Sequence, residues 1–179
     1  MNQPKHNAAD ASPASHDEAM QYLTFALGTE MFASDIRGIK EIIEYAGLTT
    51  VPMMPAFIRG VINLRGAVVP VIDLSVRFGR APTMLTRRTC IVIMEAGSDD
   101  ERQDIGVVVD AVSEVLEIAP SQIEPPPSFG ARIRSEFISG MALLDAGFAI
   151  VLDVQRVLSV EEMAGLADLA QSGITHAAA

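Results

Sequence analysis

Short runs in which hydrophobic and polar residues alternate fill the middle of the chain, and Gly, Asp and Pro separate them. A period of two puts successive side chains on opposite faces of a strand, so the pattern predicts a chain built mainly from β-strands. Tight turns are expected at Gly28, at Gly66 and at residues 145–147. The predicted fold class is all-β, as a barrel or a sandwich. The expected strands cover residues 21–27, 31–34, 39–45, 60–64, 68–73, 89–95, 105–112, 114–118, 137–144 and 148–152.

One segment of the chain occurs twice. Residues 57–78 recur without a gap as residues 137–158. Upstream of this block, Glu41 and Glu44 match Glu114 and Glu117 at a slightly different offset. Each copy is too small to bury a good core alone, so we expect both to pack into one domain. The predicted copies lie around residues 28–78 and 105–158, within a domain that covers residues 20–172. Identical residues of the repeated block are Phe57 and Phe137, Ile58 and Ile138, Gly60 and Gly140, Leu64 and Leu144, Val71 and Val151, and Asp73 and Asp153.

Helices are expected only as short pieces and at the carboxyl end. Asp73 and Asp153 each follow the repeated strand, where a carboxylate caps a single helical turn. The repeat predicts the same structural role for both. Ser159 and Glu162 form a capping box, which predicts a C-terminal helix with an apolar stripe of Met163, Leu166 and Leu169.

The two ends of the chain differ in composition from its middle. Residues 1–19 are polar and rich in Ala, Ser, Pro and Asn, without the apolar centre of a signal peptide. Residues 173–179 follow the expected end of the last helix. We expect both segments to be disordered tails. No apolar run approaches the length of a membrane span, so direct membrane insertion is not expected.

The net charge of the chain indicates which classes of partner it can bind. The chain has 23 acidic and 13 basic residues, a net charge of −10. Lys40 is the only lysine beyond the predicted tail, so nucleic acid and anionic membranes are poor candidates as partners.

Cys90 is the only cysteine of the chain, so no intramolecular disulfide can form. It lies in an apolar strand, which predicts a buried core thiol rather than a redox site.

The groups that commonly perform catalysis are missing from the predicted domain. All three histidines, His6, His16 and His176, fall in the predicted tails, and no phosphate-binding loop or metalloprotease motif occurs. The acidic residues 99–101 fit a solvated turn better than a cation site. We therefore expect no metal, no cofactor and no enzymatic activity. An enzyme or small-ligand barrel that uses Asp73 and Asp153 as an acidic pair remains the alternative, although their equivalent positions favour capping.

One face of the repeat is specialised in the first copy. Asn63 and Arg65 stand where the second copy has Leu143 and Asp145. Alternation turns Asn63 and Arg65 outward, away from their apolar neighbours. Arg and Asn together offer directional hydrogen-bond donors suited to a peptide backbone or a carboxylate of another protein.

Two other strands carry apolar residues on polar faces. In the strand 39–45, one face has Ile39, Glu41 and Ile43, and the other has Lys40, Ile42 and Glu44. In the strand 114–118, Val115 stands between polar neighbours. Such residues fit a binding groove or, equally, a strand that is buried at one end.

Three segments together resemble the CheW family of chemotaxis coupling proteins. They are PAFIRGVINLRGAVVPVIDL at 55–74, IGVVVDAVSEVLEI at 105–118 and ISGMALLDAGFAIVLDV at 138–154. The resemblance runs from about Gln21 to Leu169. It implies two intertwined five-stranded SH3-like barrels. It also implies a cytoplasmic adaptor that joins the tips of chemoreceptors to the regulatory domain of the histidine kinase CheA, in arrays beneath the inner membrane.

The resemblance also implies where the partners bind. Positions that line the receptor-binding groove between the barrels correspond to Ile39, Glu41, Arg65, Gly66 and Val115, and the exposed amide of Asn63 joins this set. Leu48 corresponds to the region that faces the kinase. Self-association into rings stays open.

Similar modules occur in CheA itself and in CheV, but this chain is too short for a kinase core and leaves no room for a receiver domain. A stand-alone adaptor is therefore expected. An adaptor of the same kind in another chemosensory pathway, such as one that controls twitching or development, remains the second candidate.

Overall fold

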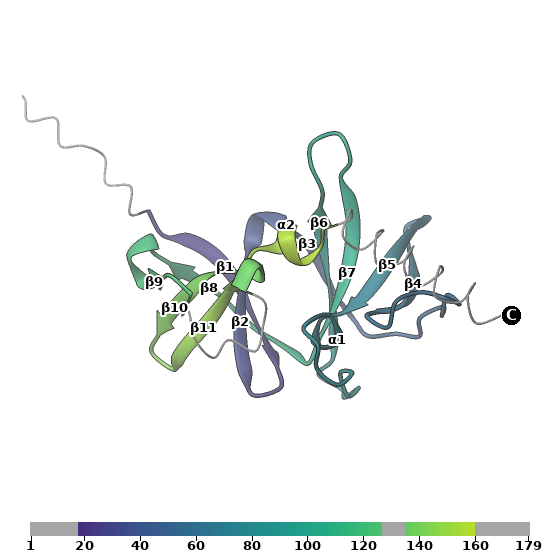
Figure 1. Ribbon diagram of the computed structural model, residues 1–179, viewed down its shortest axis with the longest axis horizontal. Helices are drawn as coiled ribbons and strands as arrows, with labels where there is room; N and C mark the ends of the chain where they lie inside the picture. Colours follow the sequence, from purple (N-terminus) through teal and green to yellow (C-terminus); the bar gives the residue numbers. More distant parts are fainter. Residues whose placement is uncertain (1–17, 127–134, 160–179) are drawn as a thin grey trace, which may run out of the picture.

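The computed structural model describes residues 18–126 and 135–159, which form two mixed β-sheets along the long axis of the molecule (Figure 1). The six-stranded sheet has the order β8-β1-β2-β11-β10-β9: β1 (Met20–Leu27), β2 (Glu30–Asp35), β8 (Ala111–Ile118), β9 (Ile123–Glu124), β10 (Ile138–Leu144) and β11 (Gly147–Leu152). The five-stranded sheet has the order β3-β6-β7-β5-β4: β3 (Ile39–Glu44), β4 (Ile58–Leu64), β5 (Ala67–Asp73), β6 (Cys90–Ala96) and β7 (Gln103–Val109). The predicted all-β class is confirmed.

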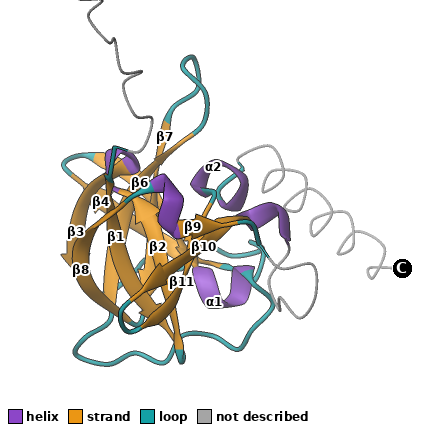
Figure 2. Ribbon diagram, turned by 90° about the vertical axis from the view of Figure 1, so that its left-hand side faces the viewer, coloured by secondary structure: helices purple, strands orange, loops and turns teal. Residues whose placement is uncertain are grey.

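Helical elements in the described residues are short: α1 (Leu74–Arg77), α2 (Val154–Val157) and the 3-10 turns η1 (Ile36–Gly38), η2 (Pro120–Gln122) and η3 (Ser135–Phe137). Figure 2 shows α1 and α2 on the same side of the strands. The predicted C-terminal helix beyond Ser159, the carboxyl-terminal tail and residues 1–17 of the amino-terminal tail lie outside the described residues.

The two halves of the chain exchange β-hairpins between the sheets. The order β3-β6-β7-β5-β4 of one sheet is repeated as β8-β1-β2-β11-β10 in the other. The hairpin β1–β2 therefore belongs to a sheet whose remaining strands come from the second half of the chain, and β6–β7 joins β3, β4 and β5. Each hairpin is attached to its host sheet by a parallel pairing, β2 with β11 and β7 with β5. The intertwined arrangement is confirmed, with the two-residue β9 as an additional sixth strand on one side.

The repeated hairpins β4–β5 and β10–β11 share an irregularity at the same place. Their pairing shifts register between Ile58 and Gly60 in one hairpin and between Ile138 and Gly140 in the other. A side chain at Gly140 would press against the carbonyl oxygen of Glu124, 2.9 Å from the position of a Cβ. At Gly60 the carbonyl of Thr49 blocks a side chain in the same way. Both glycines are retained in the two copies because another segment of backbone crosses there.

Asp73 and Asp153 cap the helical turns that follow the repeated strand. The carboxylate of Asp73 accepts hydrogen bonds from the backbone N–H of Ser75 (3.1 Å) and of Val76 (3.5 Å) at the start of α1. The carboxylate of Asp153 accepts from the N–H of Arg156 (3.2 Å) in α2. The predicted capping role is confirmed at both positions.

One hydrophobic core lies between the two sheets and includes residues from both. At its edge, the guanidinium of Arg77 lies 4.7 Å from the ring centre of Phe137 and 5.3 Å from that of Phe57. Arg77 Nε also donates to the carbonyl of Val157 (3.2 Å) in α2. Phe57 and Phe137 are equivalent in the repeat, so Arg77 joins the two copies through cation–π contacts and a hydrogen bond. The core includes Leu23, Phe25, Leu27 and Phe32 from β1 and β2, and Val92, Met94, Val107 and Val109 from β6 and β7.

The border between β7 and β8 was predicted at the wrong place. The alternation pattern continues to Val112, but β7 ends at Val109 and β8 begins at Ala111. The residue between them, Asp110, donates its N–H to the carbonyl of Ala26 (3.0 Å), and its carboxylate accepts from the N–H of Gly28 (2.5 Å). These contacts with the β1–β2 hairpin separate the strands.

Cys90 is half-buried at the start of β6, whereas the sequence predicted a fully buried thiol. Its Sγ lies 3.3 Å from the carbonyl oxygen of Arg88 and donates a weak hydrogen bond to it. We expect Cys90→Ser to change the free energy of unfolding by no more than about 1 kcal/mol, because a hydroxyl takes over the same hydrogen bond. Urea unfolding of the variant tests this expectation. Loss of partner binding in a stable Cys90→Ser protein would show instead that the thiol is functional.

Candidate protein-binding site

An ion pair joins the two edge strands of the five-stranded sheet. Glu41 lies in β3 at one edge, and Arg65 follows β4 at the other edge. The guanidinium of Arg65 donates to Glu41 Oε2 at 2.8 Å. The Arg65 side chain is 80% exposed and that of Glu41 is 25% exposed. The pair therefore presents a positive group to solvent above a carboxylate that is mostly buried.

Arg65 has a left-handed backbone conformation, which is unfavourable for residues other than glycine. Its φ is 53° and that of Gly66 is 87°, so both residues of the β4–β5 turn are left-handed. Asn63 supports the turn, because its Oδ1 accepts from the N–H of Gly66 (2.9 Å). A left-handed residue other than glycine costs about 1–2 kcal/mol. The turn therefore holds Arg65 at a cost in backbone energy.

One carboxylate oxygen of Glu41 is an unsatisfied hydrogen-bond acceptor among the described residues. Oε2 accepts from Arg65, but Oε1 is buried and has no hydrogen-bond partner among the described residues. The predicted common face of Ile39, Glu41 and Ile43 is wrong, because the pairing of β3 with β6 shifts register between Ile39 and Glu41. Ile39 packs against the main core, whereas Ile43 packs against the small cluster on the other face of the sheet. A buried acceptor without a donor is unfavourable, so this oxygen lowers the stability of the chain.

Lys40, between Ile39 and Glu41 in β3, belongs to a charge network within the chain. Lys40 Nζ pairs with Asp104 (2.6 Å) and with Glu95 (3.1 Å). The carboxylates of Asp104 and then Glu95 raise the pKa of Lys40 above its ordinary value by accepting its hydrogen bonds. The ammonium group of Lys40 is therefore already paired within the chain.

The predicted receptor-binding residues fall into two groups. Glu41, Asn63, Arg65 and Gly66 lie together around the β4–β5 turn, with Ile39 on the same strand as Glu41. Val115 belongs to β8 at the edge of the other sheet and is 48% exposed, as its polar neighbours predicted.

Sequence reasoning missed Val68 on this surface. Val68 pairs across the hairpin with Asn63 and is 73% exposed, one of the most exposed apolar side chains in the described part of the chain. Alternation with the buried Val69 and Val71 gave the signal, because it places Val68 on the outer face.

Leu48, the predicted kinase-facing residue, is half-buried and packs against a small apolar cluster inside the five-stranded sheet. The adjacent Thr49 forms an isolated bridge with Val61. This bridge has a counterpart in the other sheet, where β9 pairs with Met141, the residue that corresponds to Val61 in the repeat. Leu48 thus contributes to packing, and a partner at this site contacts only its exposed part.

The two members of the alternative acidic pair, Asp73 and Asp153, each accept hydrogen bonds that cap a helical turn. The carboxylate of Asp73 is fully buried and bonded to Arg59 (2.9 Å) and Thr83 (3.0 Å). Within residues 18–126 and 135–159, no group of three or more His, Cys, Asp or Glu side chains is placed to hold a metal ion. Across the same residues, no helix is both long and apolar enough to span a membrane.

Comparisons with known proteins place the chain in a family. The CheW-like domain family matches residues 21–162. The chain is similar to the chemotaxis protein CheW of Klebsiella aerogenes, with 36% identity over 85% of this chain and 89% of that protein. It is also similar to protein FrzA of Myxococcus xanthus, with 29% identity over 75% of this chain and 78% of FrzA.

A solved structure shares the fold as well. The crystal structure of the scaffolding protein TtCheW from Thermoanaerobacter tengcongensis superimposes with a TM-score of 0.71 and 34% identity, over 79% of this chain and 94% of TtCheW. Because the family match covers most of the domain, this chain belongs to the CheW-like domain family.

Proposed function

We propose that this chain is a chemotaxis scaffold that couples chemoreceptors to the histidine kinase CheA. The observation that carries this proposal is the match of the CheW-like domain to residues 21–162. Members of the family are described as chemotaxis and scaffolding proteins, and so the chain acts as an adaptor and not as an enzyme. Its task is to hold two partner proteins in a fixed relative position at membrane-associated receptor arrays.

The receptor-binding surface in this proposal consists of Ile39, Glu41, Asn63, Arg65, Gly66 and Val115, with Val68 at its border. The Glu41–Arg65 pair supports it, because only one copy of the repeat carries an arginine at this turn. The left-handed backbone at Arg65 and the unpartnered oxygen of Glu41 point to the same surface. A helical receptor tip that offers amide and carboxylate groups fits these donors and acceptors.

The kinase is assigned to the surface around Leu48, on the segment that bridges to β4. This surface borders the receptor-binding surface, because Gly47 and Thr49 line the same small hollow as Asn63. Two surfaces made of different residues on one domain allow receptor and kinase to bind at the same time. Coupling between two such sites is typically worth about 1–3 kcal/mol. Rings of alternating or identical subunits are compatible with this placement.

A second candidate is an adaptor for a different chemosensory pathway. The similarity to FrzA supports it, because FrzA contains the same module under a name other than CheW. Identification of the kinase that co-purifies with the chain distinguishes the two candidates.

The proposal is tested by reconstitution. Receptor-containing membranes, purified CheA and the purified chain are mixed and sedimented, and kinase in the pellet is measured together with its autophosphorylation. We expect CheA to sediment with the membranes only when the chain is present. A chain that binds neither partner in this assay contradicts the proposed function.

A further inference from the structure

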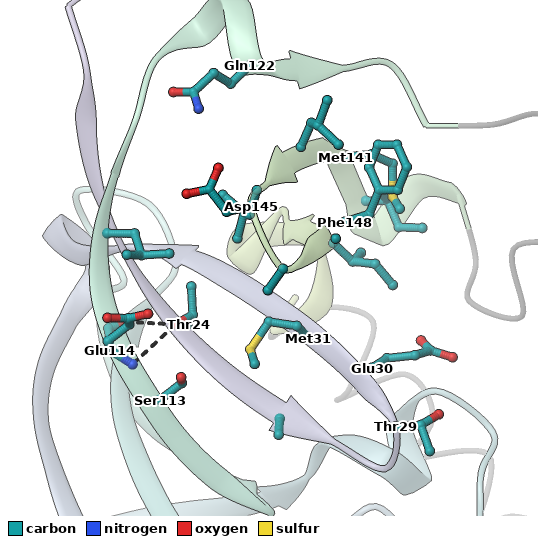
Figure 3. A pocket seen from close by; sticks show the side chains of 18 of the residues that line it. Thr24, Thr29, Glu30, Met31, Ser113, Glu114, Gln122, Met141, Asp145 and Phe148 are labelled. Carbon is teal, nitrogen blue, oxygen red and sulfur yellow. Dashed lines mark hydrogen bonds between the residues drawn. The ribbon is translucent and has the colours of Figure 1, made fainter.

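The six-stranded sheet has an open groove that the receptor and kinase surfaces do not use. The groove has a volume of about 940 Å³ and lies between β8 and the β10–β11 hairpin, above β1 and β2 (Figure 3). Cavities of this size are typical of binding sites rather than packing defects. The corresponding hollow of the five-stranded sheet has only about 230 Å³.

The two sheets differ at equivalent positions of the repeat. In the five-stranded sheet, Arg65 of the hairpin turn pairs with Glu41 of the edge strand, and neither residue lines the small hollow. The equivalent residues of the six-stranded sheet are Asp145 and Glu114, and both line the large groove. Figure 3 shows them on different walls of the space. Two carboxylates repel each other, so no ion pair spans this opening.

The lining of the groove is apolar with acidic residues around it. Leu143 and Phe148 pair across the hairpin and are 52% and 54% exposed, and Met31 and Met141 lie deeper. Four acidic residues line the groove, and no lysine or arginine is among the described residues that do so; the acids are Glu30, Glu114, Glu117 and Asp145. Arg80 pairs with Glu30 from outside the lining (2.8 Å), which leaves three carboxylates for a ligand.

We propose that this groove binds a segment of a partner protein in which a lysine or arginine stands among large apolar side chains. The basic group lies between Glu114 and Asp145 and supplies from outside the charge that Arg65 supplies internally in the other sheet. The apolar side chains contact Phe148, Leu143 and the flexible methionines, which adapt to irregular partners. This site borders Val115 of the proposed receptor-binding surface but consists of other residues, among them Glu114 and Leu116 on either side of it.

The test uses the full chain and a short fluorescein-labelled amphipathic peptide of leucine and lysine, with fluorescence anisotropy as the readout. We expect saturable binding that weakens as salt is added. Asp145→Arg should lower the affinity at least roughly tenfold, because the new arginine pairs with Glu114 and closes the opening. The variant should fold, since arginine stands at the equivalent turn of the other hairpin. Phe148→Ser, which removes part of the apolar wall, should also weaken binding and serves if Asp145→Arg does not fold.

Two controls separate the groove from simple charge attraction. Asp100→Arg makes the same change in net charge at an exposed turn outside the groove, and it should alter the affinity by less than about twofold. A twin peptide with glutamate in place of every lysine should not bind. The proposal is overturned if the lysine peptide does not bind, if Asp100→Arg weakens binding as much as Asp145→Arg, or if the glutamate peptide binds equally well.

Discussion

Asp73→Ala is expected to lower the free energy of unfolding by about 3 kcal/mol, whereas Asp153→Ala costs only about 1 kcal/mol. Both residues cap a helical turn, but Asp73 also accepts hydrogen bonds from Arg59 Nε (3.0 Å) and from Thr83 N (2.9 Å) and Oγ1 (3.0 Å). The Asp73 side chain is fully buried and that of Arg59 is 23% exposed. Removal of Asp73 therefore leaves a largely buried guanidinium without its counter-charge.

Urea unfolding of the two variants, followed by circular dichroism, measures the difference. The double variant Asp73→Ala with Arg59→Met should recover at least about 1 kcal/mol, because the uncompensated charge is gone. Equal losses for Asp73→Ala and Asp153→Ala would show that only the cap matters and that the Arg59 pair contributes nothing.

Arg65→Glu is expected to weaken receptor binding at least tenfold, which corresponds to roughly 1.4 kcal/mol or more. The substitution removes an exposed donor and places a second carboxylate beside Glu41, whose Oε2 now lies 2.8 Å from the Arg65 guanidinium. The fold should persist, since the side chain is 80% exposed and makes no core contact. Kinase binding should change by less than about threefold, because the kinase is assigned to other residues, around Leu48.

Paired titrations with a receptor fragment and the kinase regulatory domain test this expectation on one preparation. Arg102→Glu is the matched control, since Arg102 is also exposed and paired with carboxylates, those of Glu95 (3.0 Å) and Asp99 (2.6 Å). It should leave both affinities unchanged. An unchanged receptor affinity for Arg65→Glu, or a parallel loss of both partners, would place the receptor site elsewhere.

Local patterns in the sequence predicted the strands, the turns and both caps, because each depends on residues close together in the chain. They did not predict which strands pair across the halves; that expectation came only from the family resemblance. The difference between Asp73 and Asp153 was visible in principle, because the copies differ at Arg59 and Ser139. The effect of this difference on stability also depends on Thr83, because the loop after α1 brings Thr83 to the carboxylate of Asp73.

For the candidate site too, the sequence predicted the features that depend on neighbouring residues but not the contacts between distant ones. Alternation correctly predicted that Asn63 and Arg65 point outward. It also placed Glu41 on the face of Ile39, which is wrong because the register of β3 shifts between these two residues. It did not predict that Arg65 pairs with Glu41, because these residues belong to opposite edges of a sheet and meet only when the sheet curls. The partial burial of Leu48 was missed for a similar reason, since its neighbours in the cluster come from distant strands.

The exchange of hairpins sets an order of events during synthesis on the ribosome. All strands of the five-stranded sheet lie between Ile39 and Val109, so this sheet is complete before β8 is made. The hairpin β1–β2 leaves the ribosome first but waits longest, because Met31 of β2 pairs with Ala149 of β11. Long-range pairing of this kind is slow, and the unpaired edges of a waiting hairpin are open to strands of another copy. Crowded polysomes should therefore favour strand-swapped dimers of nascent chains.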